Sequence, residues 1–170
     1  MATPPLVIMG VSGSGKTTVA QELARRIDGA VFIDADDLHP AANVEKMRNG
    51  IALTDVDRAP WLDAVGRAMR AATRAGSTPV MACSALRRAY RERILAEEPE
   101  AFFVLLDVDR AELQRRLKAR KHQYMPASLL DSQLATLERL VPGEPGVIVP
   151  ITGPAGDVED TVLAKVLQAR

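Results

Sequence analysis

Short apolar runs alternate along the chain with segments in which apolar residues recur every three or four positions. The apolar runs, which we expect to be strands buried on both faces, are Leu6–Met9, Val31–Ile33, Pro79–Cys83, Phe102–Leu106 and Val147–Ile151. The helical patterns cover residues 16–28, 41–50, 60–75, 87–97, 110–121, 127–140 and 157–169, with Asp109 and Asp157 placed to start the fifth and the seventh. This alternation predicts an α/β fold of three layers, in which helices flank a five-stranded parallel sheet.

The stretch GVSGSGKT, residues 10–17, stands between the first predicted strand and the first predicted helix. This is the setting that a P-loop requires, because glycines let successive backbone N–H groups point at a phosphate chain and the helix dipole adds to the attraction. Lys16 is placed to reach the β- and γ-phosphoryl oxygens and the Thr17 hydroxyl to bind Mg²⁺. We therefore expect ATP to be bound by Gly10, Val11, Ser12, Gly13, Ser14, Gly15, Lys16, Thr17 and Thr18.

Composition narrows the class of protein. A length of 170 residues fits one domain, here residues 1–170, and equal numbers of basic and acidic residues, 22 each, argue against a nucleic-acid or membrane partner. The single cysteine, Cys83, rules out an internal disulfide framework and is expected to be a core thiol. With no signal-peptide pattern and no long apolar stretch, we expect a cytoplasmic protein.

Three carboxylates follow the second predicted strand, at the sheet edge where open α/β folds bind ligands. Asp34 and Asp36 share one side of an extended chain, so one can hold a water of the Mg²⁺ shell and the other can accept a proton from an attacking hydroxyl. The alternative is an acidic turn that caps the next helix, the role we expect for Asp37. His39 either donates to a substrate hydroxyl or braces the turn.

The third predicted strand ends in Ser84, where many P-loop ATPases have an acidic residue. The metal-associated carboxylate is therefore assigned to Asp34, an arrangement that by analogy favours a small kinase over a motor or switch ATPase. We expect Ser84 to open the next helix and face the substrate. That helix carries Arg87, Arg88, Arg91 and Arg93, and we expect most of these arginines to form an exposed basic face.

A cationic helix end, residues 115–121, leads into a polar segment closed by Pro126. We expect a lid over the phosphates at about residues 120–127. Arg116 and Arg120 lie on one helical face, so one can stack on adenine while the other neutralises the transferring phosphoryl group. The alternative is that these cations only complement the helix dipole.

Several runs together resemble the gluconate kinases of the small P-loop type. They are MGVSGSGKT (9–17), DDLHP (36–40), NVEKM (43–47), LTDVDRAPWL (53–62), CSAL (83–86) with Tyr90-Arg91, and SLLDSQLATLE (128–138). The resemblance spans nearly the whole chain and implies ATP-dependent phosphorylation of D-gluconate at its terminal hydroxyl, with a fold like that of nucleoside monophosphate and shikimate kinases. It also implies a homodimer.

Gluconate needs acceptors for its hydroxyls and a cation for its carboxylate. Asp36 and His39, with the substrate-binding helices at about residues 36–76, suit the hydroxyls. Arg58 suits the carboxylate because a guanidinium binds it bidentately, and Lys46 and Arg48 are weaker candidates. Arg58 can instead pair with a neighbouring aspartate at the surface, and Trp61 is expected to be a core anchor.

Two other functions stay open at the level of sequence. Another small-molecule kinase of the same fold would phosphorylate shikimate, a nucleoside monophosphate or a related sugar acid. A nucleotide-binding switch would need a water-positioning residue and effector surfaces, for which the sequence offers no candidate.

Overall fold

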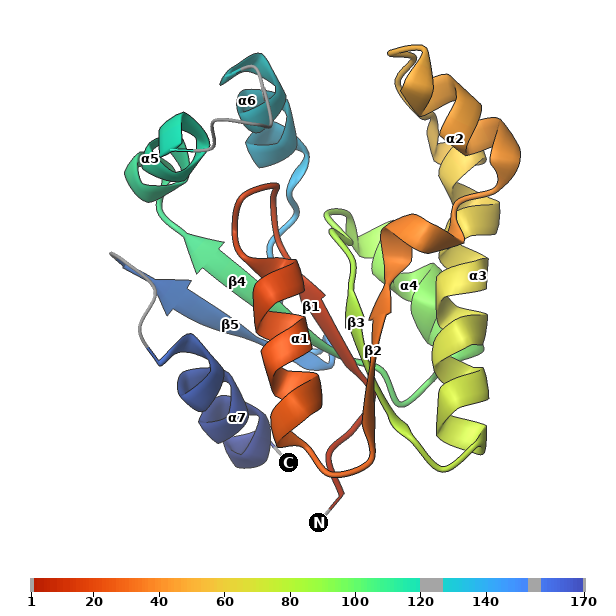
Figure 1. The fold of residues 1–170 in the computed structure, drawn as a ribbon, viewed down its shortest axis with the longest axis vertical. Coiled ribbons are helices and arrows are strands. Elements are labelled where there is room, and N and C mark those ends of the chain that lie inside the picture. The colour runs from red at the N-terminus through yellow and green to blue at the C-terminus, as the bar shows by residue number, and fades with distance from the viewer. Residues whose placement is uncertain (1, 120–126, 153–156, 170) are drawn as a thin grey trace.

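Five parallel strands form one sheet in the order β2-β3-β1-β4-β5, with helices on both of its faces (Figure 1). The computed structural model describes residues 2–119, 127–152 and 157–169. The strands are β1 (Leu6–Met9), β2 (Ala30–Asp34), β3 (Thr78–Ala82), β4 (Phe102–Val108) and β5 (Gly146–Ile151). The helices are α1 (Lys16–Arg26), the 3₁₀ helix η1 (Ala35–Leu38), α2 (Ala41–Arg48), α3 (Asp55–Arg74), α4 (Arg88–Glu97), α5 (Arg110–Ala119), α6 (Ala127–Thr136) and α7 (Val158–Gln168). The predicted three-layer α/β fold is confirmed.

The central strand β1 separates two hydrophobic cores. Leu6 and Ile8 face the core formed with α1 and α7, whereas Val7 and Met9 face the core formed with α3 and α4. Successive side chains of a strand point to opposite faces, so a strand with helices on both sides must be apolar at every position. All four side chains of β1 are fully buried, and burial of each contributes about 1.5–3 kcal/mol.

The expectation that every strand is buried on both faces is wrong for the two edges of the sheet. β2 and β5 each have one strand neighbour, and most of their side chains are only partly buried. Val31 in β2 is 38% exposed. Short apolar runs look alike whether a strand is central or at an edge, because strand order is not written in the local pattern.

The third long helix begins five residues earlier than its apolar pattern predicts. Thr54 accepts a hydrogen bond from the Asp57 N–H at 3.1 Å, and the Asp57 carboxylate accepts one from the Thr54 N–H at 2.9 Å. This capping box starts the helix at Asp55 and leaves Pro60 inside it. The sequence prediction had placed Pro60 at the first helical position, where proline is common.

Helices α3 and α4, which pack on the same face of the sheet, approach each other closely at Gly66. A Cβ atom there would lie 2.7 Å from the Cβ of Glu97 and 2.9 Å from the carbonyl oxygen of Ile94. No side chain fits this crossing without a shift of the α4 backbone. Gly66 therefore fixes the distance at which α4 packs on α3.

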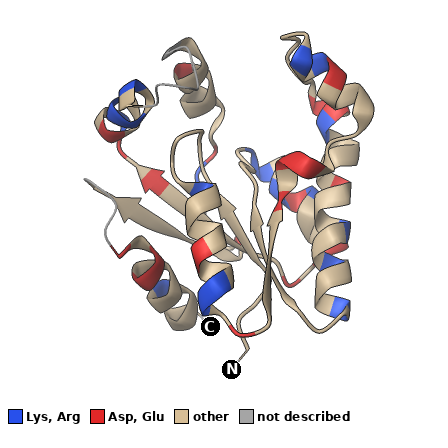
Figure 2. Ribbon diagram, in the orientation of Figure 1, with Lys and Arg blue, Asp and Glu red and all other residues tan. Residues whose placement is uncertain are grey.

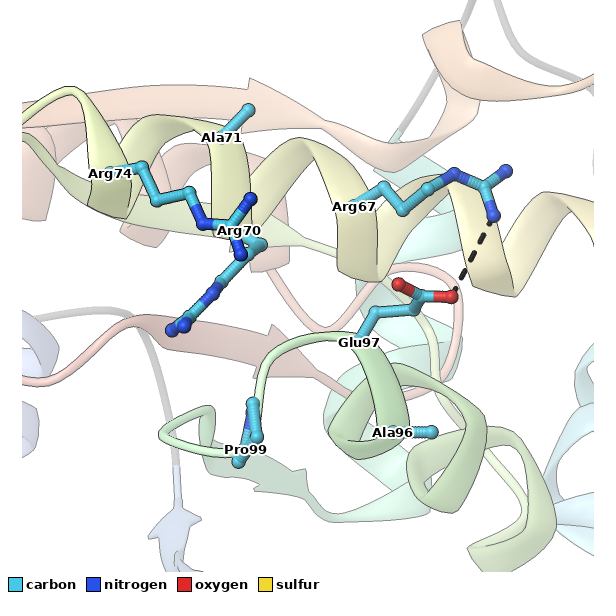
Figure 3. Close-up of a pocket in the computed structure, with 7 residues that line it drawn as sticks. All are labelled: Arg67, Arg70, Ala71, Arg74, Ala96, Glu97 and Pro99. Carbon is cyan, nitrogen blue, oxygen red and sulfur yellow. Dashed lines mark ion pairs between the residues drawn. The ribbon is translucent and has the colours of Figure 1, made fainter.

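A cavity of about 430 Å³ lies between the C-terminal halves of α3 and α4 (Figure 3). Two of the three arginines that line it have acidic partners: Arg67 lies 3.7 Å from Glu97, and Arg70 lies 3.6 Å from the fully buried Glu98. Cations near the C-terminal ends of helices also complement the helix dipoles. Elsewhere basic and acidic side chains are interspersed over the helices (Figure 2), as the balanced composition suggests.

Arg91 corrects the expectation of an exposed basic face on α4, because its side chain is only 1% exposed. Its guanidinium donates to both carboxylate oxygens of Glu144, at 2.7 and 3.2 Å, and to the carbonyl oxygen of Ala85 at 2.8 Å. Desolvation raises the pKa of Glu144, but the hydrogen bonds from Arg91 and from the Val141 N–H together outweigh it and lower that pKa overall. This buried pair ties α4 to the loop before β5.

We predict that Arg91→Met destabilises the fold strongly, because it leaves the buried Glu144 carboxylate without its cation. Breaking such a pair costs about 3–5 kcal/mol, which lowers the Tm of a protein of this size by roughly 6–20 °C. Arg93→Met on the same helix is the matched control, since Arg93 pairs with Asp63 at the surface and such pairs contribute about 0–1 kcal/mol.

Thermal unfolding of the two variants at neutral pH provides the measurement. Equal shifts in Tm for both would contradict the assignment. Because folding lowers the pKa of Glu144, the contribution of the pair is present above the ordinary carboxyl pKa and is lost as the pH falls through the lowered value. The difference between wild type and Arg91→Met should therefore narrow in acid.

Candidate active site

The P-loop joins β1 to α1 and places its backbone N–H groups at the carboxyl edge of the sheet. At Gly10 an added Cβ would lie 2.8 Å from Ser14 Oγ and 3.1 Å from the carbonyl oxygen of Leu106. Gly15 precedes α1 in a left-handed conformation, with φ of 92°, which suits glycine. The first turn of α1 has no acidic residue, so the N-terminal dipole of the helix is available to an anion.

Two polar side chains of the P-loop indicate which kind of ligand the loop can bind. Lys16 Nζ donates to the carbonyl oxygen of Val11 at 3.0 Å, so the ammonium group lies over the loop. Ser14 Oγ is buried and has no hydrogen-bond partner within the described part of the chain. A buried hydroxyl without a partner is costly, and a phosphate oxygen or a water can supply one.

The carboxylates lie across from the P-loop at the end of β2. Asp34 pairs in register with Ala82 of β3, and its Oδ1 accepts the Asp36 N–H at 2.9 Å. Asp34 thus caps the short helix η1, to which Asp37 itself belongs. The helix that Asp37 was expected to cap, α2, begins after Pro40 without a side-chain cap. Trp61 donates its indole N–H to the Ala35 carbonyl oxygen at 2.7 Å, so α3 holds the turn in place. The expected core position of Trp61 is confirmed, with 5% exposure.

The environment of Asp36 favours proton uptake. Partial desolvation in the cleft is the largest cause that raises its pKa, although the side chain keeps access to solvent, and the nearby Asp34 carboxylate adds to the rise. His39 and Lys16 oppose the shift by their charge, without cancelling it. A carboxylate with a raised pKa is a stronger base than an ordinary aspartate.

One cavity of about 170 Å³ brings the two sides together. It is lined by residues from the P-loop, the acidic turn, the end of β3 and α6, namely Ser12, Lys16, Thr17, Asp34, Asp36, Ala82, Cys83, Ser84 and Gln133. Five of these, Lys16, Thr17, Asp34, Asp36 and Ser84, are residues that the sequence nominated for catalysis, metal or substrate. The adjoining Cys83 is buried, which raises the pKa of its thiol to about 12.

Ser84 corrects a detail of the sequence prediction. The helix that it was expected to open begins at Arg88, so Ser84 lies in the preceding loop. Its carbonyl oxygen accepts the Gly10 N–H at 3.3 Å, and it is this contact that holds the loop beside the P-loop.

A second cavity of about 300 Å³ lies on the other side of the P-loop. Gly13, Gly15, Arg116, Ile151 and Val158 are among the residues that line it. Arg116 donates to the Gly13 carbonyl oxygen at 3.1 Å and to Glu112 at 3.0 Å. Hydrogen bonds from Arg115 and Arg116 lower the pKa of Glu112 to about 2, so its charge orients Arg116. Arg120 and most of the expected lid fall outside the described residues.

His39, one of the residues expected to bind the acceptor, lies in the acidic turn. His39 stacks on Trp61 with ring centroids 4.1 Å apart, and its Nδ1 lies 3.3 Å from Asn43 Nδ2. Desolvation lowers the pKa of His39, which favours the neutral ring. These contacts brace the acidic turn, one of the two roles left open for His39, and Asp36 keeps its access to the cavity.

The candidate cations on α2 and α3 do not line the P-loop cavities. Lys46 Nζ binds both carboxylate oxygens of Asp57, at 3.0 and 2.9 Å. Arg58 Nη1 donates to the Leu53 carbonyl oxygen at 2.9 Å and to the Tyr90 hydroxyl at 3.3 Å, and lies 3.8 Å from Asp55. Lys46 is therefore committed to Asp57, whereas the Nε and Nη2 atoms of Arg58 have no acceptor within the described ranges.

Sequence reasoning missed Gln133 on α6. Its side-chain oxygen accepts the Ser12 N–H at 2.6 Å, across 121 positions of sequence. The only signal was its place in the run SLLDSQLATLE, where nothing local marks one polar residue over another.

The described residues contain no group of three or more His, Cys, Asp or Glu side chains placed to hold a metal ion. In the same residues, no helix combines the length and the apolar character needed to cross a bilayer.

Comparison with known proteins gives consistent results. A family model described as an AAA domain matches residues 6–140. The chain is 51% identical over 148 residues to a gluconokinase of Gluconobacter oxydans (strain 621H), covering 87% of this chain and 82% of the relative. A solved gluconokinase from Sinorhizobium meliloti 1021 matches with a TM-score of 0.82 and 37% identity, over 99% of this chain and 94% of that one. An unliganded sugar kinase from Janibacter sp. HTCC2649 matches with a TM-score of 0.85 and 41% identity, over 95% and 93% of the two chains.

Proposed function

The chain belongs to the gluconokinase family of P-loop kinases, and we propose that it transfers the γ-phosphoryl group of ATP to the terminal hydroxyl of D-gluconate, giving 6-phospho-D-gluconate. The observation that carries the proposal is that the P-loop lysine and the acidic turn line one cavity. A phosphate donor and a hydroxyl acceptor can meet there. The family supports a sugar acid as the acceptor.

The P-loop is proposed to hold the phosphate chain of ATP. Within the site, Gly10 to Thr18, the N–H groups of Gly10 and Ser12 already donate to Ser84 and Gln133. Other backbone N–H groups of the loop are proposed to bind the phosphates, and the Lys16 ammonium to reach the charge that develops on the transferring group. Arg116, held against the loop by Glu112, is proposed to contact the nucleotide from the second cavity. Arg120 and the lid at about residues 120–127 are proposed to cover the phosphates.

Thr17 and Asp34 fit a hydrated Mg²⁺. At nucleotide sites this ion takes only one or two protein oxygens, with phosphates and water completing its shell. The lack of a larger ligand group among the described residues agrees with that mode of binding. When bound, Mg²⁺ neutralises charge on the β- and γ-phosphates.

Asp36 is proposed to act as the base. The terminal oxygen of gluconate attacks the γ-phosphorus in line, its proton passes to the Asp36 carboxylate, and the bond from the γ-phosphorus to the bridging oxygen breaks. The raised pKa of Asp36 suits this task. Asp34 fixes the position of Asp36 through its hydrogen bond to the Asp36 N–H.

Arg58 is proposed to bind the carboxylate of gluconate, with Ser84 and His39 near its hydroxyls. One edge of the guanidinium is held by Leu53 and Tyr90, which leaves Nε and Nη2 as a fork for a bidentate partner. The surface alternative has some support in the 3.8 Å distance to Asp55. We further propose that the protein is a homodimer, as the family resemblance implies, and that it works in the cytoplasm, as expected from the sequence pattern.

We predict that gluconate will raise ATP consumption far above that seen with shikimate, a nucleoside monophosphate or no acceptor. A coupled assay of ADP formation with wild-type protein and each acceptor tests this. A higher kcat/KM for another acceptor would assign a different kinase activity. Background rates with all of them would favour a nucleotide-binding switch.

We predict that Asp36→Asn lowers kcat by about 10²-fold or more, because the amide cannot take the proton, with a small change in KM for ATP. Asp37→Asn is the control, as it changes the neighbouring exposed carboxylate. In wild type, kcat should fall as the pH drops through the pKa of Asp36, at a higher pH than an ordinary aspartate would give. Equal effects of the two substitutions would contradict the assignment of the base.

We predict that Arg58→Ala and, to a smaller extent, Arg58→Lys lower kcat/KM for gluconate. Hydrogen bonds to a charged group contribute about 1.5–3 kcal/mol, which corresponds to roughly a ten- to hundredfold change. Glucose has no carboxylate, so its low rate should hardly respond to either substitution. Arg48→Ala on α2 tests the other candidate cation. A uniform fall for both acceptors, or no change, would assign Arg58 to structure.

A further inference from the structure

The helix that follows the expected lid segment, α6, reaches the P-loop through one side chain. Gln133 Oε1 accepts the Ser12 N–H at 2.6 Å, and Gln133 lines the cavity shared by Lys16, Thr17 and Asp36. It brings a neutral amide into a cavity that is otherwise lined by an ammonium group, two carboxylates, three hydroxyls and the side chains of Ala82 and Cys83.

The hydrogen bond to Ser12 fixes which way the carboxamide points. A backbone N–H can only donate, so the atom that it contacts must be the carbonyl oxygen of the side chain. The Nε2 group of the same side chain, with its two N–H donors, takes no part in this hydrogen bond. Neither donor has an acceptor among the residues that the structure describes, and the side chain is half-buried.

The position of α6 is itself held by the loop after β3. The Glu138 N–H donates to the Leu86 carbonyl oxygen at 2.7 Å, and the Glu138 carboxylate accepts the Arg88 N–H at 3.2 Å. Leu130 on α6 is buried in the core. Gln133 therefore stands on a helix that packing and hydrogen bonds keep beside the P-loop, and is not a freely moving surface side chain.

A phosphoryl group transferred in this cavity needs hydrogen-bond donors around it. During transfer, charge spreads over the three equatorial oxygens of the phosphoryl group, while Asp34 and Asp36 add negative charge nearby. Lys16 offers a charged donor, and an uncharged N–H donor adds stabilisation without weakening Asp36 as a base. Gln133 brings such donors to the cavity from α6.

We propose that Gln133 contacts the γ-phosphoryl group of ATP through its Nε2 donors, while Ser12 holds its Oε1. This inference rests on the proposed kinase function and adds a residue of α6 to the phosphoryl-transfer site. The contact exists with ATP, strengthens in the transition state and is absent with ADP, which has no γ-phosphate.

The test compares Gln133→Glu with Gln133→Met. The glutamate keeps an acceptor for the Ser12 N–H but loses the two donors, whereas the methionine loses both. Ser132→Ala, next to Gln133 and exposed on α6, is the control. The measurements are kcat with gluconate, the Kd values of ATP and ADP by calorimetry, and Tm to confirm folding.

We expect both Gln133 variants to lower kcat about ten- to a hundredfold and to weaken ATP binding more than ADP binding, with Gln133→Glu the more impaired because its charge repels phosphate. Ser132→Ala should match wild type. Wild-type kcat in Gln133→Glu would show that Oε1 only braces the loop and would overturn the proposal, as would equal losses of ATP and ADP affinity. If wild type proved inactive on gluconate, the proposed function would fail, and the ratio of ATP to ADP affinity would still decide the role of Gln133.

Discussion

Three neighbouring parallel strands end at one level of the sheet, with Asp34 opposite Ala82 and Ala82 opposite Ile8. This register brings the acidic turn, the Ser84 loop and the P-loop to the same edge. The strands stay in register because their side chains are packed between helices on both faces, and a one-residue slip would turn each strand's side chains to the other face. This strand register therefore sets where the P-loop lies relative to the acidic turn.

Around this edge, neighbouring residues hold several of the groups that are proposed to act. Asp34 accepts the Asp36 N–H, Trp61 fixes the turn through Ala35, and Glu112 orients Arg116. Such partners reduce the freedom that a side chain would otherwise lose when substrate binds. The buried pair of Arg91 and Glu144 also restrains the loop that contains Ser84, because Arg91 donates a hydrogen bond to the carbonyl oxygen of the neighbouring Ala85.

The fold and the reaction rest on different kinds of observation. A P-loop with a parallel sheet is compatible with many phosphoryl-transfer reactions, so the architecture alone does not choose an acceptor. Membership of the gluconokinase family supports the proposal of a sugar acid as the acceptor, and the proposed meeting point of its hydroxyl and the phosphate chain is the cavity that Lys16 and Asp36 line. The contacts agree with the preference for Arg58 over Lys46, because Lys46 binds both carboxylate oxygens of Asp57, whereas only the Nη1 atom of Arg58 has hydrogen-bond acceptors among the described residues.

The sequence by itself determined the P-loop, the strand and helix alternation and the acidic turn, because each depends on a contiguous motif or a local period. It did not separate Arg91 from the exposed arginines near it, and it overlooked Gln133, since their partners Glu144 and Ser12 lie 53 and 121 positions away. The apolar pattern also predicted the start of α3 at Pro60, whereas the capping box of Thr54 and Asp57 starts the helix at Asp55. Tertiary structure decided these points because burial and pairing depend on which distant segments the sheet order brings together, and no local pattern records that order.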